Sequence, residues 1–386
     1  MDFMGFKRAN GKVGTRNYVG VLSTVVCANE VARAIADGVQ GAVAFTHQQG
    51  CCQTPPDLKR VTDTLAGLGN NANLASVLLV SLGCEGTDVK AVAERIQATG
   101  KKVETLIIQE EGGAARTRAK GVLLAQQLAV EASALKREPC SSKNIVLGLK
   151  CGSSDTSSGL ASNPALGVAV ERFVSQNAVA IMGEVTEFIG AEHLLAAQAK
   201  DKTTGRKIIE LVERMENRVK AMGVDMRGGQ PTPGNIQGGL TTIEEKSLGA
   251  IAKVGSAVVQ DVYEYGEVPR VKGLVVMDSP GREPEILTGL AAAGANVIVF
   301  TTGRGAPQGF PFVPVIKVTG NMHTWEHLND HMDLSVHGVM TGDESLDKAG
   351  ARICDQVLAT ASGEGTKAEI SGYVQAMDIY VTGPVI

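Results

Sequence analysis

The chain has 386 residues, of which 44% are hydrophobic, 20% are charged and 4% are aromatic, and its formal net charge is −4. This length allows two or three domains with sizeable cores, and the composition excludes a disordered or fibrous chain. The weak negative charge gives no indication of nucleic acid or an anionic membrane as a partner.

No targeting or membrane-spanning segment is predicted. The first eight residues lack an apolar signal region, and no apolar run approaches the ~20 residues that cross a bilayer. With seven cysteines and no signal peptide, we expect a cytoplasmic protein with reduced thiols. The cysteines are therefore expected to be buried, catalytic or metal-binding.

In chain order, the first half predicts repeated strand–loop–helix units. Continuous apolar strands that alternate with amphipathic helices indicate a parallel sheet covered on both faces. The predicted strands cover residues 18–26, 42–45, 77–82, 103–108, 145–149 and 178–182, and the predicted helices cover 29–36, 58–68, 88–98 and 114–136, with one more after Pro164.

Helices predicted over 191–199 and 203–222 lead into a Gly- and Pro-rich loop at 227–239, which is typical of a domain junction. The last third repeats the alternation, with predicted strands over 271–277, 296–300 and 313–318 and helices over 285–293 and 345–361. We therefore predict an α/β fold. A larger Rossmann-like parallel-sheet domain covers residues 1–230, and a smaller Rossmann-like domain covers 231–386.

Several reactive side chains directly follow predicted strands. Four of the seven cysteines do so, namely Cys27, Cys51, Cys84 and Cys151, and Glu184 does so as well. Because the carboxyl ends of parallel strands share one edge of a sheet, these side chains are predicted to converge where ligands bind.

Three interpretations of this convergence stay open. Small buried cysteines can simply fill tight turns. A mixed thiolate, imidazole and carboxylate set can instead hold one Fe(II), Zn or Mn ion. An iron–sulfur cluster is less favoured, because the C-x2-C spacing is missing. The candidate ligands for a single metal are His47, Cys51, Cys84, Glu85 and Glu184.

The loop after the strand at 145–149 carries Lys150, Cys151, Ser153, Ser154 and Asp155. Its small residues offer N–H and hydroxyl donors to an anion, although they can also satisfy only one another in a turn. Lys150, Lys246 and Arg304 are further candidates to bind an anionic substrate, with a structural ion pair as the alternative for Arg304.

Carboxylates at 184–192 and 110–111 are candidates for a general base, or they only favour helix N-termini. His323, His327 and His331 are spaced to lie along one helix face. They lack a metal-binding pattern such as H-E-x-x-H, and we expect a partly exposed helix face there.

Motifs spread along the chain resemble the altronate/galactarate dehydratase family. They lie at residues 6–17, 46–53, 82–85, 151–164, 184–192, 233–235, 238–249 and 302–305. Full-length members have a small N-terminal domain before this catalytic part. The resemblance therefore implies a separate small subunit, an oligomeric enzyme and a divalent metal, most commonly iron(II).

The resemblance implies a lyase that removes the C2 proton of a small anionic 2-hydroxy acid and expels the group on C3. We favour 3-sulfolactate, which gives pyruvate and sulfite, over a sugar acid such as altronate or galactarate. A dinucleotide-dependent dehydrogenase and a non-catalytic scaffold are distant alternatives. The implied roles are metal binding by Cys51, Cys84, Glu85, Cys151 and Glu184, catalysis by His47, Glu187 and Lys246, and substrate binding by Lys150, Ser153, Ser154, Asp155 and Arg304.

Overall fold

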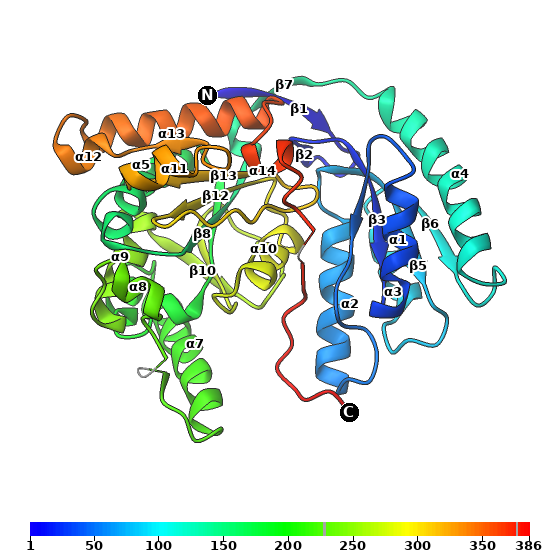
Figure 1. The fold of residues 1–386 in the computed structure, drawn as a ribbon, viewed down its shortest axis with the longest axis horizontal. Helices are drawn as coiled ribbons and strands as arrows, with labels where there is room; N and C mark the ends of the chain where they lie inside the picture. Colours follow the sequence, from blue (N-terminus) through cyan, green and yellow to red (C-terminus); the bar gives the residue numbers. More distant parts are fainter. Residues whose placement is uncertain (227–228, 376) are drawn as a thin grey trace.

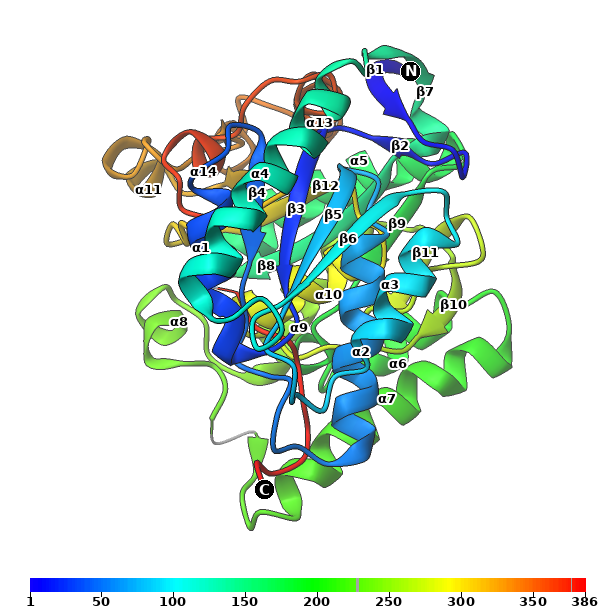
Figure 2. The same cartoon turned by 90° about the vertical axis from the view of Figure 1, so that its right-hand side faces the viewer.

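The computed structural model describes residues 1–226, 229–375 and 377–386, which form two α/β lobes (Figure 1). The N-terminal lobe contains a parallel sheet with strand order β4-β3-β5-β6. Helices α1 and α4 cover one face of this sheet and α2 and α3 cover the other (Figure 2). The elements are β3 (Tyr18–Ser23), α1 (Asn29–Ala36), β4 (Ala42–Phe45), α2 (Pro55–Gly69), β5 (Leu74–Ser81), α3 (Val89–Gln97), β6 (Lys102–Ile107) and α4 (Ala114–Ser133).

The C-terminal lobe contains a seven-stranded parallel sheet with the order β10-β11-β9-β8-β12-β13-β14. Helices α5 and α13 pack on one face, and α10 packs between the other face and α2 of the N-terminal lobe. The elements are β8 (Val146–Gly152), α5 (Asn163–Ser175), β9 (Val179–Met182), β10 (Val259–Tyr263), β11 (Gly273–Met277), α10 (Glu283–Ala292), β12 (Val297–Thr302), β13 (Val315–Thr319), β14 (Leu334–Ser335) and α13 (Leu346–Ala361).

Further elements complete the structure, among which β1, β2 and β7 form a small antiparallel sheet. Among the described residues, no helix is long and apolar enough to cross a membrane. The remaining elements are β1 (Asp2–Lys7), β2 (Val13–Gly14), β7 (Glu138–Ser141), α6 (Glu192–Ala197), α7 (Lys202–Lys220), α8 (Pro233–Gln237), α9 (Ile243–Ile251), α11 (Met322–His327), α12 (Gly338–Thr341) and α14 (Lys367–Ile370).

The two lobes share a hydrophobic core and are also joined by hydrogen bonds. Asn71 Nδ2, after α2, donates to Ala291 O at 2.8 Å and Ala295 O at 2.9 Å in the C-terminal lobe. The C-terminal segment runs between the lobes (Figure 1). There the Asp57 carboxylate accepts a hydrogen bond from the backbone N–H of Thr382 at 3.0 Å. The two sheets are therefore fixed relative to each other.

The α/β prediction with Rossmann-like parallel sheets is confirmed. The predicted division at residue 230 does not coincide with a division between sheets, because β11 pairs with β9 and β12 pairs with β8. Strands from both sides of residue 230 thus form one sheet, and the lobes separate between β6 and β8. Part of the predicted junction loop, residues 227 and 228, lies outside the described residues. The predicted histidine stripe is also shorter, because α11 ends at His327.

Candidate active site

Four buried ionisable side chains meet at the carboxyl ends of β8 and β9. The Glu184 carboxylate accepts hydrogen bonds from Lys150 Nζ and, at 3.1 Å, from Lys253 Nζ. Lys253 Nζ also donates to Glu187 Oε2 at 2.7 Å. None of the four residues is more than 4% exposed. We call Lys150, Glu184, Glu187 and Lys253 the buried ion cluster. Its two carboxylates and two ammonium groups balance, as buried charges require.

Strand register and an unusual backbone conformation place Glu184 in this cluster. β8 and β9 pair as far as Leu149 and Met182, so Lys150 and Cys151 at the end of β8 lie beside the residues that follow β9. Glu184 then adopts φ 68°, in the left-handed region that non-glycine residues rarely occupy. Its backbone N–H donates to Ser279 Oγ at 2.7 Å, and its Oε2 accepts from Cys151 N at 2.9 Å. Such strain is concentrated at functional sites.

The two carboxyl groups of the buried ion cluster differ in pKa. Burial alone would raise the pKa of Glu184, but the charges of Lys150 and Lys253 together hold it below its usual value. Burial raises the pKa of Glu187, and the neighbouring Glu184 charge raises it further. Of the two, Glu184 is therefore the carboxyl group that favours the ionised form, and Glu187 is the one that more readily holds a proton.

Cys151 separates the buried ion cluster from a pocket of about 340 Å³ that it helps to line. Its Sγ lies 3.2 Å from Ser154 Oγ and 3.5 Å from Asn163 Nδ2. Burial raises the pKa of Cys151, and the charge of Glu187 acts in the same direction. Both effects favour the neutral thiol over the thiolate.

Lys246, on α9, lines the same pocket. Its Nζ donates to Gln230 Oε1 at 2.8 Å and to Asn235 Oδ1 at 3.3 Å. Asn235 in turn donates from Nδ2 to Ser154 O at 2.9 Å. The charge of Lys246 also acts on Glu187, where it opposes the rise in pKa. Lys246 thus places a cation in this pocket, whose lining includes Cys151 and no member of the buried ion cluster.

Three other predicted substrate-binding residues, at the end of β8 and in the loop after it, differ in accessibility. Lys150 is 1% exposed, and its Nζ also donates to Cys151 O at 2.6 Å and Gly281 O at 3.1 Å. It therefore holds Glu184 in place and presents no free donor. Ser153 is exposed with φ 48°, whereas Ser154 is buried against Cys151.

A second pocket of about 640 Å³ has Asp155 in common with the first. The Asp155 Oδ2 atom accepts from Asn321 Nδ2 at 2.7 Å. Arg304 also lines this pocket; its backbone N–H donates to Ser153 O at 2.9 Å, and its guanidinium donates to neutral oxygens. A Cβ atom at Gly303 would overlap the Asp155 carboxylate, so glycine is needed for these loops to meet.

His323 and His327 line this second pocket together with Arg304. Their ring centroids are 3.9 Å apart, and His327 Nδ1 lies 3.0 Å from His323 O. The sequence predicts only a helix face for these histidines. In the structure both imidazoles line the second pocket opposite the loop after β8, so they can donate hydrogen bonds to an anionic group bound there.

His47 lies in the other lobe, after β4, and is fully buried. Its Nδ1 accepts from Gln49 N at 3.1 Å, so Nε2 carries the proton that it donates to Ser23 O at 3.0 Å. Burial lowers the pKa of His47 to about 4. The ring is therefore neutral at pH 7, and its two nitrogens are already hydrogen-bonded to Gln49 and Ser23.

The predicted metal ligands lie at two different sheet edges. Cys51, Cys84 and Glu85 follow strands of the N-terminal lobe, whereas Cys151 lies at the end of β8 and Glu184 follows β9 in the C-terminal lobe. Over residues 1–226, 229–375 and 377–386, no three His, Cys, Asp or Glu side chains form a group that could hold a metal ion. These residues do not fit a preformed iron site, and we derive no chemical step through a metal.

Two charged residues of the site are absent from the sequence-based assignment. Lys253 lies seven residues after Lys246, in the 3-10 turn Ala252–Val254 that follows α9. A spacing of about two helical turns could have indicated that the two lysines point the same way. Glu283 Oε1 lies 3.9 Å from Lys150 Nζ at the first residue of α10. It follows the strand predicted at 271–277, and the strand-end argument used for Glu184 also applies to it.

Known protein families match both lobes. The family described as "D-galactarate dehydratase/Altronate hydrolase, second domain" matches residues 5–133, and "D-galactarate/Altronate dehydratase, C-terminal" matches residues 142–383. The interval between the two matches contains β7, where the lobes also separate. The family boundary and the sheet boundary therefore agree.

Full-length comparison gives similar relatives. The chain is 38% identical to "(2R)-sulfolactate sulfo-lyase subunit beta" of Chromohalobacter salexigens, over 96% of this chain and 95% of that protein. It is 32% identical to the altronate dehydratase of Escherichia coli, over 94% of this chain and 74% of the relative. The galactarate dehydratase (L-threo-forming) of Escherichia coli is 31% identical over 94% and 73%. The chain belongs to the D-galactarate/altronate dehydratase family.

Proposed function

We propose that this chain is a lyase for a small 2-hydroxy acid and that the reaction takes place at the carboxyl edge of the C-terminal lobe. The observation that carries this proposal is the pair of buried carboxyl groups, Glu184 and Glu187, whose pKa values shift in opposite directions. Glu184 is hydrogen-bonded to the backbone of Cys151, which lines the pocket of about 340 Å³. Opposite shifts of this kind identify acid–base pairs in enzymes. The names of the family relatives, a sulfo-lyase and two dehydratases, support the reaction class.

In this proposal Glu187 removes the proton from C2 of the substrate. The electron pair left at C2 forms the C2=C3 double bond, and the group on C3 leaves with its bonding electrons. The enol so formed takes the 2-keto form by proton transfer. Glu184 stays ionised and, together with Lys253, holds Glu187 in place, so a positioned base is available without rearrangement of charge.

The cations of the two pockets suit a substrate with negative charge at both ends. Lys246 lies in the pocket beside Cys151, and Arg304 lies in the pocket beyond Asp155. Both donate only to neutral acceptors among the described residues, so their charges are available to an anion. We assign the substrate carboxylate to Lys246 and the distal anionic group to Arg304.

We propose (2R)-3-sulfolactate as the substrate, with pyruvate and sulfite as products, and a separate small subunit as the partner. The match to a sulfo-lyase subunit beta over nearly the whole length of both chains supports this choice. A sugar acid such as altronate is the second candidate, because altronate dehydratase matches over 94% of this chain. Iron(II) stays a prediction from the family resemblance, and metal analysis of the purified protein tests it.

The decisive experiment measures product formation by the purified chain, with and without the small partner. The substrates are (2R)-3-sulfolactate, altronate and galactarate, followed through sulfite and 2-keto acid. We expect sulfite release from sulfolactate in the presence of the partner. Turnover of a sugar acid but not of sulfolactate would favour the second candidate. If none of the three substrates were turned over with metal supplied, the lyase proposal would be refuted.

A further inference from the structure

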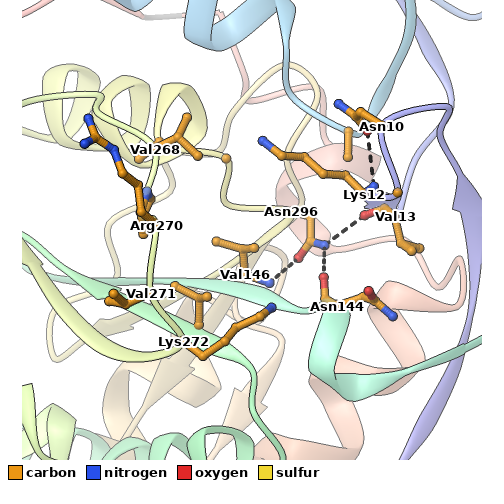
Figure 3. Close-up of a pocket in the computed structure, with 16 residues that line it drawn as sticks. Asn10, Lys12, Val13, Asn144, Val146, Val268, Arg270, Val271, Lys272 and Asn296 are labelled. Atoms are coloured by element: carbon orange, nitrogen blue, oxygen red, sulfur yellow. Dashed lines mark hydrogen bonds between the residues drawn. The ribbon is translucent and has the colours of Figure 1, made fainter. Parts of the chain in front are cut away.

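A third, separate pocket of about 280 Å³ lies at the opposite edge of the sheet in the C-terminal lobe (Figure 3). Its lining includes Val146 and Val179, the first residues of β8 and β9. The candidate active site lies at the carboxyl ends of the same two strands. The pocket also contains Asn10 and Lys12, from the motif at 6–17 that has no part in the candidate active site.

The lining carries three cations, Lys12, Arg270 and Lys272, and no carboxylate. Lys12 and Lys272 lie on opposite sides of the pocket, with Val146 between them (Figure 3). Arg270 pairs with Glu267 at 2.9 Å, outside the lining. Formal positive charge therefore exceeds negative charge at this pocket.

The two lysines lack charged partners. Lys272 Nζ donates to a neutral acceptor, Lys143 O, at 2.9 Å. Within the described part of the chain, no acceptor or acidic side chain contacts Lys12 Nζ. Both lysines are exposed, but partial desolvation by the pocket walls lowers their pKa, and the charge of Lys143 lowers that of Lys272 further. An anion placed between the two ammonium groups would reverse these unfavourable contributions.

The walls of the pocket are preformed. Asn296 Nδ2 donates to Val13 O at 3.0 Å and Asn144 O at 2.9 Å, and its Oδ1 accepts from Val146 N at 2.9 Å. Asn10 Oδ1 accepts from Lys12 N at 3.1 Å and fixes the loop that carries Lys12. These bonds tie the β1–β2 connection to the start of β8, so binding requires little rearrangement.

We propose that this pocket binds a small multivalent anion, a phosphate group or a compact di- or tricarboxylate, between Lys12 and Lys272. The volume of about 280 Å³ lies just below the usual range for small-molecule sites and suits a ligand of that size rather than a nucleotide. The apolar floor, with Val146 and Val179, excludes water below the charged groups and strengthens their attraction for an anion.

Calorimetric titration of the full chain with inorganic phosphate and, separately, with malonate tests this proposal at constant ionic strength. The test variant is Lys12→Ala/Lys272→Ala. Its charge-matched control is Lys90→Ala/Lys348→Ala, which removes two exposed lysines elsewhere. We expect saturable binding of at least one probe, with affinity at least about tenfold weaker in the test variant and unchanged in the control.

Binding of phosphate alone would indicate a phosphorylated ligand, and binding of malonate alone would indicate a polycarboxylate; both support the proposal. Both variants change exposed residues, and circular dichroism verifies that each is folded. The proposal would be overturned if neither probe bound the unmodified chain at concentrations up to about 10 mM, which is far above the dissociation constants of specific sites. Equal binding by the test variant and the control would also overturn it.

Discussion

Replacement of Lys253 by methionine tests the electrostatic account of the candidate active site. Lys253 Nζ lies 3.1 Å from Glu184 and 2.7 Å from Glu187, and the lysine is fully buried. Removal of one partner from a buried ionic group typically costs about 3–5 kcal/mol. For Lys253→Met we expect the free energy of unfolding to fall by about 3 kcal/mol, the low end of this range. The loss is small because Glu187 already has a raised pKa and can take up a proton in the variant.

Urea denaturation followed by circular dichroism measures this loss at pH 7.5 and at pH 5.5. In the variant, the folded-state pKa of Glu187 lies further above its unfolded value, so protonation stabilises the folded state as the pH falls. The loss should therefore be smaller at pH 5.5. Lys317→Met is the matched control, because Lys317 is also fully buried, but its Nζ has no hydrogen-bond partner among the described residues. A loss for Lys253→Met below about 1 kcal/mol, or equal to that of the control, would refute the account.

Three further predictions concern stability and substrate binding. Burial lowers the pKa of Lys317 to about 7, so the free energy of unfolding should rise by on the order of 3–5 kcal/mol between pH 7 and pH 10. Denaturation measurements should show no such rise for Lys317→Met. Burial lowers the pKa of His47 to about 4, so the free energy of unfolding should fall by about 3 kcal/mol as the pH drops from 6.5 to 4. His47→Gln should weaken this pH dependence, and an unchanged pH dependence would contradict the buried neutral state of His47. His323→Ala and His327→Ala should each raise KM for the anionic substrate about tenfold with little change in kcat, and an unchanged KM would exclude both residues from binding.

The strand-end argument identified part of the candidate site from the sequence. The apolar runs at 145–149 and 178–182 correctly placed Cys151 and Glu184 at neighbouring carboxyl ends. Arg304 was found by the same reasoning, after the strand at 296–300. These residues lie next to their strands in sequence, so local pattern was sufficient.

Pairing between distant strands was not predictable in this way. Apolar strands 18–26 and 145–149 look alike in sequence, yet β3 and β8 belong to different sheets. The choice depends on non-local packing, in which β11 and β12 flank β9 and β8. The single converging edge expected for Cys51, Cys84 and Cys151 is therefore two edges, one in each lobe.

The roles of individual ionisable residues also depend on three-dimensional surroundings. His47 looked like a base from its position after a strand, but its two ring nitrogens are occupied by Ser23 and Gln49. Lys150 looked like an anion-binding residue, but it is buried against Glu184. Burial and partners determine these properties, and neither follows from residue type or spacing.

The most direct test of the central claim compares turnover of (2R)-3-sulfolactate by Glu187→Gln and His47→Gln, each assayed with the small partner and with metal supplied. Loss of a positioned general base typically lowers the rate by about 10²- to 10⁴-fold. We predict such a loss in kcat for Glu187→Gln, in a protein that remains folded, and kcat within about threefold of the unmodified chain for His47→Gln. Full activity of Glu187→Gln together with inactivity of His47→Gln would contradict a reaction at the carboxyl edge of the C-terminal lobe.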